Sequence, residues 1–414
     1  MDDNERRILT FTSIGHFFTH FTMLLFPPLV TTIARDLEME LNRVFSISFL
    51  MYLLYGICAI PWGFLADRWD SRLTMALGII VAGIGLLWAG LVRNPLMLPV
   101  ALAVVGVGNS AYHPTGLALL SKGMRLRGRG LGLNGIFGNI GIALAPFSAG
   151  VLGWIVGWKM TFIFFGVAGI LGGLLVVMMP FSISRLKDKQ RGEGVTGQSA
   201  LVLFLLLCVV VVFSGLMYRS FTLVLPSWLE FRFTDSFDKI SKLFGGLDRT
   251  PAEIGINGLM AALATGLTMI AGMVGQVAGG RIADGMDLRK AYLLFFSLAF
   301  PFLLLARLVP GWASLSLLAM FAFFALGLQP IENSLYSMLI PAKWRSSGFG
   351  IKFTLGFGVG SIAVANIAKF EPLIGLDGIV NLIVGFLLLT IVASLVLLFT
   401  SRGAAIRHKT GGVA

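Results

Sequence analysis

Long apolar runs recur along the whole chain, separated by short polar connections. Each run has about 20 residues or more, which is enough for a helix to cross about 30 Å of hydrocarbon. Runs that exceed this length indicate tilted helices or short turns outside the membrane. The first run is too long for the apolar region of a signal peptide. The pattern predicts twelve transmembrane helices, at 8–34, 44–65, 73–92, 95–121, 129–155, 159–181, 200–229, 251–283, 290–308, 312–341, 347–369 and 376–400.

Composition agrees with an all-α integral membrane protein. Hydrophobic residues make up 57% of the chain and charged residues only 13%, whereas an ordinary soluble domain has about 25% charged residues. Glycine is frequent, at 51 of 414 residues, as expected for helices that pack closely in a membrane.

The connections between the predicted helices differ in positive charge. The N-terminal segment, alternate connections and the C-terminal tail hold 20 Lys and Arg residues, and the opposite connections hold 10. Because loops rich in Lys and Arg stay on the cytoplasmic side, we predict a multi-pass protein of the cell inner membrane with both termini in the cytoplasm. This bias explains most of the net charge of +12, so no nucleic-acid partner is needed.

A polar stretch at 182–199 divides the predicted helices into two sets of six. We expect an N-terminal six-helix bundle at 1–181, a cytoplasmic linker at 182–199, a C-terminal six-helix bundle at 200–400 and a cytoplasmic tail at 401–414.

The two sets of helices share sequence. GFLADRWDSR at 63–72 matches GRIADGMDLR at 280–289 with an offset of 217, and RGLGLNGIFG at 129–138 matches SGFGIKFTLG at 347–356 with an offset of 218. Nearly equal offsets at two places indicate an internal duplication. Two pseudo-symmetric bundles with a substrate site between them are one architecture of transporters.

The first of these stretches resembles the loop signature of the major facilitator superfamily, G-x-x-x-D-R-x-G-R-R. Asp70 and Ser71 depart from the signature, so its turn glycine and one basic residue are missing. The resemblance implies that charged residues at these helix ends latch one conformation of a transporter. The latch residues are Gly63, Asp67, Arg68, Arg72 and, in the second half, Gly280, Asp284 and Arg289.

A narrower resemblance covers SIGHFFTHF, GNSAYHPTGLALLSKG and GIFGNIGIALAP in spans one, four and five. These stretches are similar to the fosmidomycin-resistance type of drug exporter, with His16 in span one, His113-Pro114 in span four and Asn139 in a Gly-Asn-x-Gly run. That type commonly carries an acidic residue four positions after the first histidine, where this chain has His20. The resemblance implies proton-coupled export of a drug-like compound.

Ionisable side chains inside apolar spans point to function, because burying them without a partner is costly. Polar neighbours in the same spans complete the candidate site for substrate binding and proton coupling. The set is His16, His20, His113, Tyr112, Asn139, Tyr218, Arg219, Gln329, Glu332, Asn333 and Lys352.

The histidines allow several interpretations. His16 and His20 lie one helical turn apart and face one way. With His113 they could chelate a metal, they could exchange protons near physiological pH, or they could simply form hydrogen bonds between helices. No Asp or Glu accompanies them in the membrane interior of the first half, so we predict no metal site.

The second half carries the other charges. Glu332 shares a helix face with Gln329 and Asn333, and we expect it to pair with Lys352 or Arg219. Two cations and one carboxylate leave a positive membrane interior, which favours an anionic ligand. Prolines at 114 and 330 predict breaks in spans four and ten.

These features predict a secondary transporter that works by alternating access, as a monomer in the lipid bilayer and without a cofactor. Proton-coupled export of a small anionic or drug-like organic compound, by antiport, is the main interpretation. The alternatives are an importer of an organic acid or phosphate compound, a divalent-metal carrier, and a non-transporting sensor or scaffold. The chain lacks a Walker A loop, a nucleophile elbow and an H-E-x-x-H motif, so we expect neither ATP drive nor an enzyme.

Overall fold

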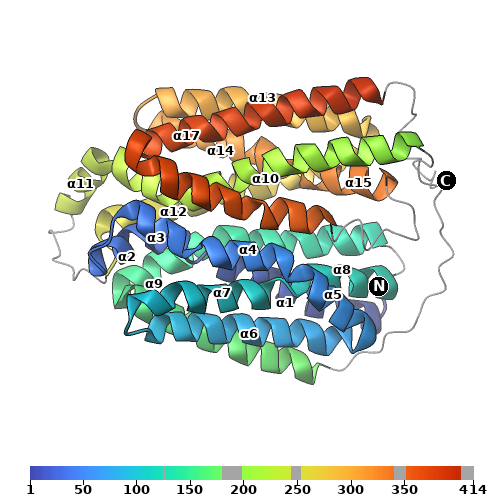
Figure 1. The fold of residues 1–414 in the computed structure, drawn as a ribbon, viewed down its shortest axis with the longest axis horizontal. Coiled ribbons are helices and arrows are strands. Elements are labelled where there is room, and N and C mark those ends of the chain that lie inside the picture. Colours follow the sequence, from blue (N-terminus) through green and yellow to red (C-terminus); the bar gives the residue numbers. More distant parts are fainter. Residues whose placement is uncertain (125–126, 180–197, 244–252, 340–350, 402–414) are drawn as a thin grey trace.

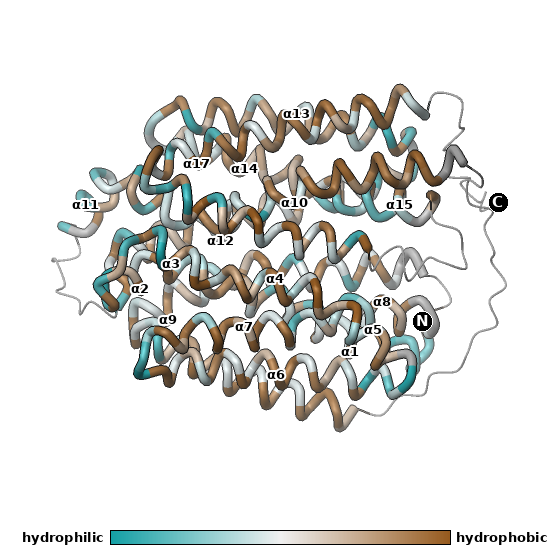
Figure 2. The backbone as a smooth tube through the Cα atoms, viewed as in Figure 1, coloured by the Kyte–Doolittle hydropathy of each residue, from teal (hydrophilic) through white to brown (hydrophobic). Residues whose placement is uncertain are grey.

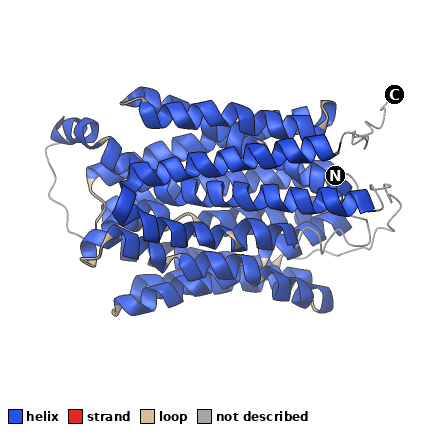
Figure 3. Ribbon diagram, turned by 45° about the horizontal axis from the view of Figure 1, so that its top comes forward, coloured by secondary structure: helices blue, strands red, loops and turns tan. Residues whose placement is uncertain are grey.

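The structure is a computed structural model that describes residues 1–124, 127–179, 198–243, 253–339 and 351–401. Its regular elements are helices, and no strand occurs in these ranges (Figure 3). Helices of the first half are α1 (Asp3–Met23), η1 (Pro27–Leu29), α2 (Val30–Asp36), α3 (Leu41–Ile47), α4 (Phe49–Ile57), α5 (Ala59–Arg68), α6 (Ser71–Leu91), η2 (Pro95–Met97), α7 (Leu98–Asn109), α8 (Tyr112–Gly123) and α9 (Arg127–Met178).

The second half is built in the same way. It contains α10 (Gln198–Arg232), α11 (Thr234–Leu243), α12 (Ile256–Gly285), α13 (Leu288–Leu308), α14 (Trp312–Gly327), α15 (Gln329–Leu339), the π-helix η4 (Thr354–Gly358) and α17 (Gly360–Thr400). In Figure 1 the two halves lie side by side with their helices along the long axis, and the start of α1 and the last residues of α17 lie at the same end.

Ten helical segments of the described chain are long and apolar enough to cross a membrane. Two of them, with 49 and 50 residues, each contain one non-helical glycine, Gly157 with φ 82° and Gly375 with φ 64°. Only glycine adopts such positive φ values at little cost, so the chain turns back at these two points. Each long helix therefore supplies two crossings, as the bend of α17 in Figure 1 shows. The predicted twelve-helix membrane fold is confirmed.

Breaks in two spans coincide with the predicted proline positions. α7 ends at Asn109 and α8 begins at Tyr112, just before Pro114. In the second half α14 ends at Gly327 and α15 begins at Gln329, just before Pro330. The interruptions free backbone groups in the middle of the bundle, where polar side chains gather.

Polar residues concentrate at the two ends of the molecule, and hydrophobic residues follow the helices between them (Figure 2). At the end opposite to the start of α1, the halves are joined by hydrogen bonds. The Thr31 hydroxyl donates to Glu230 at 2.6 Å, and the backbone N–H of Ile254 donates to the Gly153 carbonyl at 2.9 Å. The bundle limits remain a prediction, because most of the predicted linker and tail, at 182–197 and 402–414, lies outside the described residues.

Candidate functional site

Three histidines meet in the first half. His16 and His20 project from α1 and His113 from α8, and their ring centroids lie 4.9 to 5.8 Å apart. The ring of Tyr112 stacks on His16 at 4.6 Å. Residues almost a hundred positions apart thus form one group of imidazoles, which we call the histidine cluster.

Hydrogen bonds fix the histidine cluster. Nδ1 of His16 lies 2.9 Å from the backbone carbonyl of Asn134 on α9, and Nε2 of His16 lies 3.1 Å from Nε2 of His20. The Tyr112 hydroxyl donates to Oδ1 of Asn134 at 2.6 Å. Asn134 therefore holds both His16 and the tyrosine that stacks on it.

His113 connects the two halves. The Tyr55 hydroxyl, on α4, lies 3.0 Å from its Nε2. Its ring stacks on Phe353 at 4.4 Å and lies 5.2 Å from Phe357 in the η4 π-helix. Isolated π-helical turns occur often at functional sites, because they re-aim side chains. Here the turn places two aromatic rings of the second half against the histidine cluster.

Arg219, on α10, is buried at the boundary between the halves, with 4% of its surface exposed. Its guanidinium carbon lies 3.7 Å from the ring centroid of Tyr52 in the first half and 5.9 Å from that of Tyr218. Within the described part of the chain Arg219 forms no ion pair, and its Nε has no hydrogen-bond acceptor. Such a stack only partly offsets the cost of burying the charge.

Glu332 and Lys352 form a second polar group inside the second half. Oε1 of Glu332 lies 2.8 Å from Nζ of Lys352, and its Oε2 accepts a hydrogen bond of 2.5 Å from the Tyr292 hydroxyl. Lys352 also donates to Asn333 and lies 5.3 Å from the ring of Tyr336. Of the two cations considered for Glu332, the structure places Lys352 beside it.

A chain of amides crosses the boundary as well. Asn139 on α9 and Gln276 on α12 exchange two hydrogen bonds, of 2.5 and 2.9 Å. Gln276 also donates to Gln329 on α15 at 3.0 Å. Asn139 and Gln329, predicted from sequence, are thus joined through a residue that sequence reasoning missed.

The tyrosines beside these polar groups were only partly predicted from the sequence. All six tyrosines of the chain contact these polar groups. Tyr52, Tyr55, Tyr292 and Tyr336 were not among the predicted site residues, and neither were Asn134 and Gln276. The signal was available, because tyrosine is rare in this chain and its hydroxyl needs a partner when buried. The six are Tyr52, Tyr55, Tyr112, Tyr218, Tyr292 and Tyr336.

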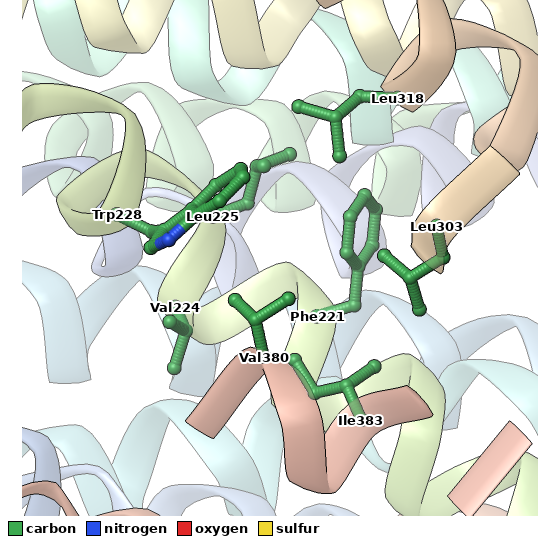
Figure 4. A pocket seen from close by; sticks show the side chains of 8 residues that line it. All are labelled: Phe221, Val224, Leu225, Trp228, Leu303, Leu318, Val380 and Ile383. Atoms are coloured by element: carbon green, nitrogen blue, oxygen red, sulfur yellow. The ribbon is translucent and has the colours of Figure 1, made fainter. Parts of the chain in front are cut away.

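Two other kinds of site find no support in the described residues. No three His, Cys, Asp or Glu side chains there are arranged to hold a metal ion. A small pocket between α10, α13, α14 and α17 is lined by apolar side chains such as Phe221, Leu303 and Leu318 (Figure 4). The indole N–H of Trp228, which also lines it, donates to Asp377. This pocket offers nothing that recognises a charged ligand.

The loop between α5 and α6 is held by a helix cap and by contacts of Arg72. Oδ1 of Asp70 accepts hydrogen bonds from the backbone N–H groups of Arg72, at 2.7 Å, and Leu73, and so caps α6. The Arg72 guanidinium lies 3.8 Å from Asp70 and donates to the carbonyl of Met179 at the end of α9. Asp70, a departure from the loop signature, is therefore a helix cap.

The equivalent loop between α12 and α13 repeats this geometry. Asp287 caps α13 and pairs with Arg289 at 2.6 Å, and Arg289 also donates to the carbonyl of Ser401 at the end of α17. Burial alone would raise the pKa of Asp287, but hydrogen bonds and the charge of Arg289 outweigh it and hold that pKa below its ordinary value. Each arginine thus ties its loop to the last helix of its own half.

Among the remaining latch residues, those whose side chains the structure describes are not engaged in the same way. Arg68 and Asp284 are exposed, the side chain of Asp67 lies outside the described part, and nothing lies within 4 Å of the position where Gly280 would carry a side chain. Gly63 faces Pro114. In this structure the guanidinium groups of Arg72 and Arg289 bind within their own halves. A conformational latch at the seven residues remains a prediction.

Known proteins resemble this chain in sequence and in fold. The "Probable L-galactonate transporter" of Escherichia coli (strain K12) is 28% identical over 34% of this chain and 31% of its own length. The "Probable hexose phosphate transport protein" of Chlamydia trachomatis is 27% identical over 45% of this chain and 40% of its own length. The chain thus spans well under half of these relatives. A crystal structure of the nucleoside transporter NupG superposes with a TM-score of 0.68 at 14% identity, over 94% of this chain and 99% of that one.

A family match covers most of the sequence. Residues 12–365 match the Major Facilitator Superfamily. The match includes both loop repeats, the histidine cluster, Arg219 and the Glu332–Lys352 pair. The chain belongs to the Major Facilitator Superfamily.

Proposed function

We propose that this protein is a secondary transporter that carries a small anion across the membrane by alternating access. The observation that carries the proposal is Arg219, a buried cation between the two halves with no ion-pair partner among the described residues. An arginine keeps its charge in any protein environment, and its fork of N–H donors matches carboxylate and phosphate groups. An anion that bound there would supply the acceptor that Nε lacks.

The other charges of the interior do not compete for this role. Glu332 and Lys352 neutralise one another at 2.8 Å within the second half, which leaves the positive charge of Arg219 uncompensated. The excess positive charge that the sequence predicts for the membrane interior would therefore lie on Arg219. Tyr52, from the first half, covers the guanidinium at 3.7 Å, so a ligand at Arg219 would touch both halves. Contact with both halves is what a substrate needs in order to bias their relative movement.

The relatives support an anion. One is named as a transporter of galactonate, a carboxylate, and another as a transporter of hexose phosphate, a phosphate ester. Export, a drug-like substrate, the fosmidomycin-resistance type, a monomeric state, and an inner-membrane location with cytoplasmic termini remain predictions from the sequence. A non-transporting sensor or scaffold is the competing function, and flux measurements separate the two.

The test compares anions with a neutral analogue. Purified protein in detergent is heated with D-galactonate, glucose 6-phosphate or D-galactose, and the same compounds are offered to proteoliposomes in flux assays. We expect at least one anion to bind and cross, and D-galactose to do neither. A ligand at 100 times its Kd stabilises a protein by about 2.7 kcal/mol, which a melting curve detects.

Arginine variants locate the site. Arg219→Gln should abolish stabilisation by the anion, and Arg219→Lys should retain part of it, because a lysine keeps the charge without the fork. Arg43→Gln removes the same charge from a side chain that is 71% exposed, and serves as the matched control. Wild-type anion affinity in Arg219→Gln would refute the proposal, and binding without flux in wild type would favour a sensor.

A further inference from the structure

The histidine cluster lies beside the proposed anion site, and its hydrogen bonds show which ring nitrogen is free to take a proton. Resting on the proposed function, we infer that His20 accepts a proton together with the anion at Arg219, so that proton and anion cross the membrane in the same direction. His16 is the positioning residue that holds His20 ready.

The direction of the hydrogen bonds follows from one fixed acceptor. A backbone carbonyl can only accept, so Nδ1 of His16 carries a hydrogen and donates to Asn134 at 2.9 Å. In neutral His16 the other ring nitrogen, Nε2, is then an acceptor. Nε2 of His20, 3.1 Å away, must donate to it. The neutral His20 ring is left with an unprotonated Nδ1, which is the nitrogen that can take a proton.

His20 is better suited to this task than His113. His16 and His20 are only partly buried, although both lie deep in an apolar span, whereas His113 is 6% exposed. The Tyr55 hydroxyl occupies Nε2 of His113, and Phe353 stacks on its ring. His20 is therefore less enclosed than His113.

Protonation would strengthen the contact with His16. A proton that binds Nδ1 of His20 turns the ring into an imidazolium, and its bond from Nε2 to His16 becomes charge-assisted. No covalent bond other than this N–H bond forms or breaks, and release on the other side of the membrane returns the proton to water.

The charges around His20 set the condition for protonation. Tyr52 lies against the Arg219 guanidinium at 3.7 Å, and Tyr55, one helical turn further along α4, lies 3.0 Å from His113 of the histidine cluster. Lys352 adjoins Phe353, whose ring stacks on His113 at 4.4 Å. Two neighbouring cations repel one another, so the imidazolium is unfavourable while Arg219 has no anion. The titratable or charged groups that face the site from α1, α4, α8 and α10 are His16, Tyr52, Tyr55, Tyr112, His113, Tyr218 and Arg219. None of them is a carboxylate that could balance the second positive charge.

An anion at Arg219 changes this balance. It would supply the missing negative charge and stabilise the protonated His20, and by reciprocity the protonated His20 would bind the anion more tightly. Proton and anion then enter and leave together. In this coupling the proton and the anion move in the same direction. It differs from the antiport expected from the sequence, in which protons and substrate move in opposite directions.

Proton uptake on anion binding tests the inference directly. Binding of D-galactonate, or of glucose 6-sulfate as a phosphate-ester analogue with a fixed charge, is measured by calorimetry in two buffers of different ionisation enthalpy between about pH 5 and 8, where histidine titrates. Neither probe changes its charge in this range, so any proton belongs to the protein. We expect uptake of about one proton per anion, and affinity that weakens as the pH rises.

Two histidine variants test whether His20 is the residue that takes up the proton. His20→Gln should still bind the anion at low affinity but take up no proton, whereas His408→Gln, which removes the histidine outside the histidine cluster, should behave as wild type. Anion binding without uptake, or with proton release, overturns the inference and leaves the proposed function intact. Uptake that persists in His20→Gln overturns the assignment to His20. Failure of both probes to bind overturns the anion site and the inference together.

Discussion

The Glu332–Lys352 pair provides a test that separates a structural ion pair from a proton-carrying one. Glu332 is 8% exposed and Lys352 is 7% exposed, and Oε1 and Nζ lie 2.8 Å apart. Glu332→Gln keeps the shape of the side chain and an oxygen that can accept from Tyr292. It removes the negative charge that compensates Lys352. The amide NH2 group that takes the place of Oε1 would face the ammonium group of Lys352, which is also a hydrogen-bond donor.

The magnitude follows from the burial of both partners. Removing one partner of a buried ion pair costs about 3–5 kcal/mol, because the other charge is left without compensation. Lys352 keeps its hydrogen bond to Asn333 and the ring of Tyr336 at 5.3 Å, so we expect the lower end, about 3 kcal/mol. Glu40 is the matched control, since its carboxylate lies 3.8 Å from Arg43 and both side chains are more than two-thirds exposed. Glu40→Gln should cost less than about 1 kcal/mol.

The assay is a double-mutant cycle. Unfolding of detergent-solubilised wild type, Glu332→Gln, Lys352→Met and the double variant is followed by tryptophan fluorescence in a denaturant titration. We expect the double variant to be much more stable than the sum of the single losses predicts, because it leaves no buried charge. It should also bind the anion as wild type does and still take up a proton. If the stability losses of the two single variants add up in the double variant, Glu332 and Lys352 do not stabilise each other as a buried ion pair. If the double variant takes up no proton when the anion binds, Glu332 takes part in proton coupling.

Two further predictions concern the contact between the halves and the loop caps. A methyl group at Gly56 would lie 2.2 Å from the backbone nitrogen of Gly358, so Gly56→Ala should cost about 1–3 kcal/mol and impair flux. Gly385→Ala, on α17 with nothing within 4 Å of the added methyl group, should do neither in the same melting and flux assays. Asp287→Asn should lower the melting temperature at neutral pH, because it removes the charge paired with Arg289. Since the pKa of Asp287 is lowered in the folded protein, that stabilisation is present above the ordinary Asp value and is lost as the pH falls, so the two melting curves should converge below about pH 4. A difference between them that is independent of pH would contradict this.

Features that depend on local sequence were predictable. Twelve crossings follow from the lengths of apolar runs, and the breaks before Pro114 and Pro330 follow from the missing donor of proline. His16 and His20 face one way because four residues make about one helical turn. Even the turns at Gly157 and Gly375 fall where two predicted spans meet.

Contacts between distant helices were not predictable from such patterns. The sequence could mark Tyr52 as a buried tyrosine that needs a partner, but it could not name the partner, because only the approach of α10 places the ring of Tyr52 against Arg219. Gln276 gains its importance from Asn139, on a helix of the other half. Asp70 looked like a defect of the loop signature, because a helix cap is recognised only once the start of α6 is known. Each depends on which helices become neighbours, and a single sequence does not contain that.

The strengths of the contacts suggest how the molecule moves. Within each half, arginines tie a loop to the last helix, and Glu332 is bound to Lys352 by a buried ion pair. Between the halves the contacts at Thr31 and Asn139 are hydrogen bonds. Such a bond contributes about 0.5–1.5 kcal/mol net between neutral groups and about 1.5–3 kcal/mol where one group is charged. The ties within each half favour halves that move as rigid bodies. Their relative movement has to break the hydrogen bonds between them and part of the apolar packing, which forms one cluster across both halves. Arg219 lies at the contact between the halves, and its Nε has no hydrogen-bond acceptor. An anion bound there would accept this hydrogen bond and strengthen the contact between the halves.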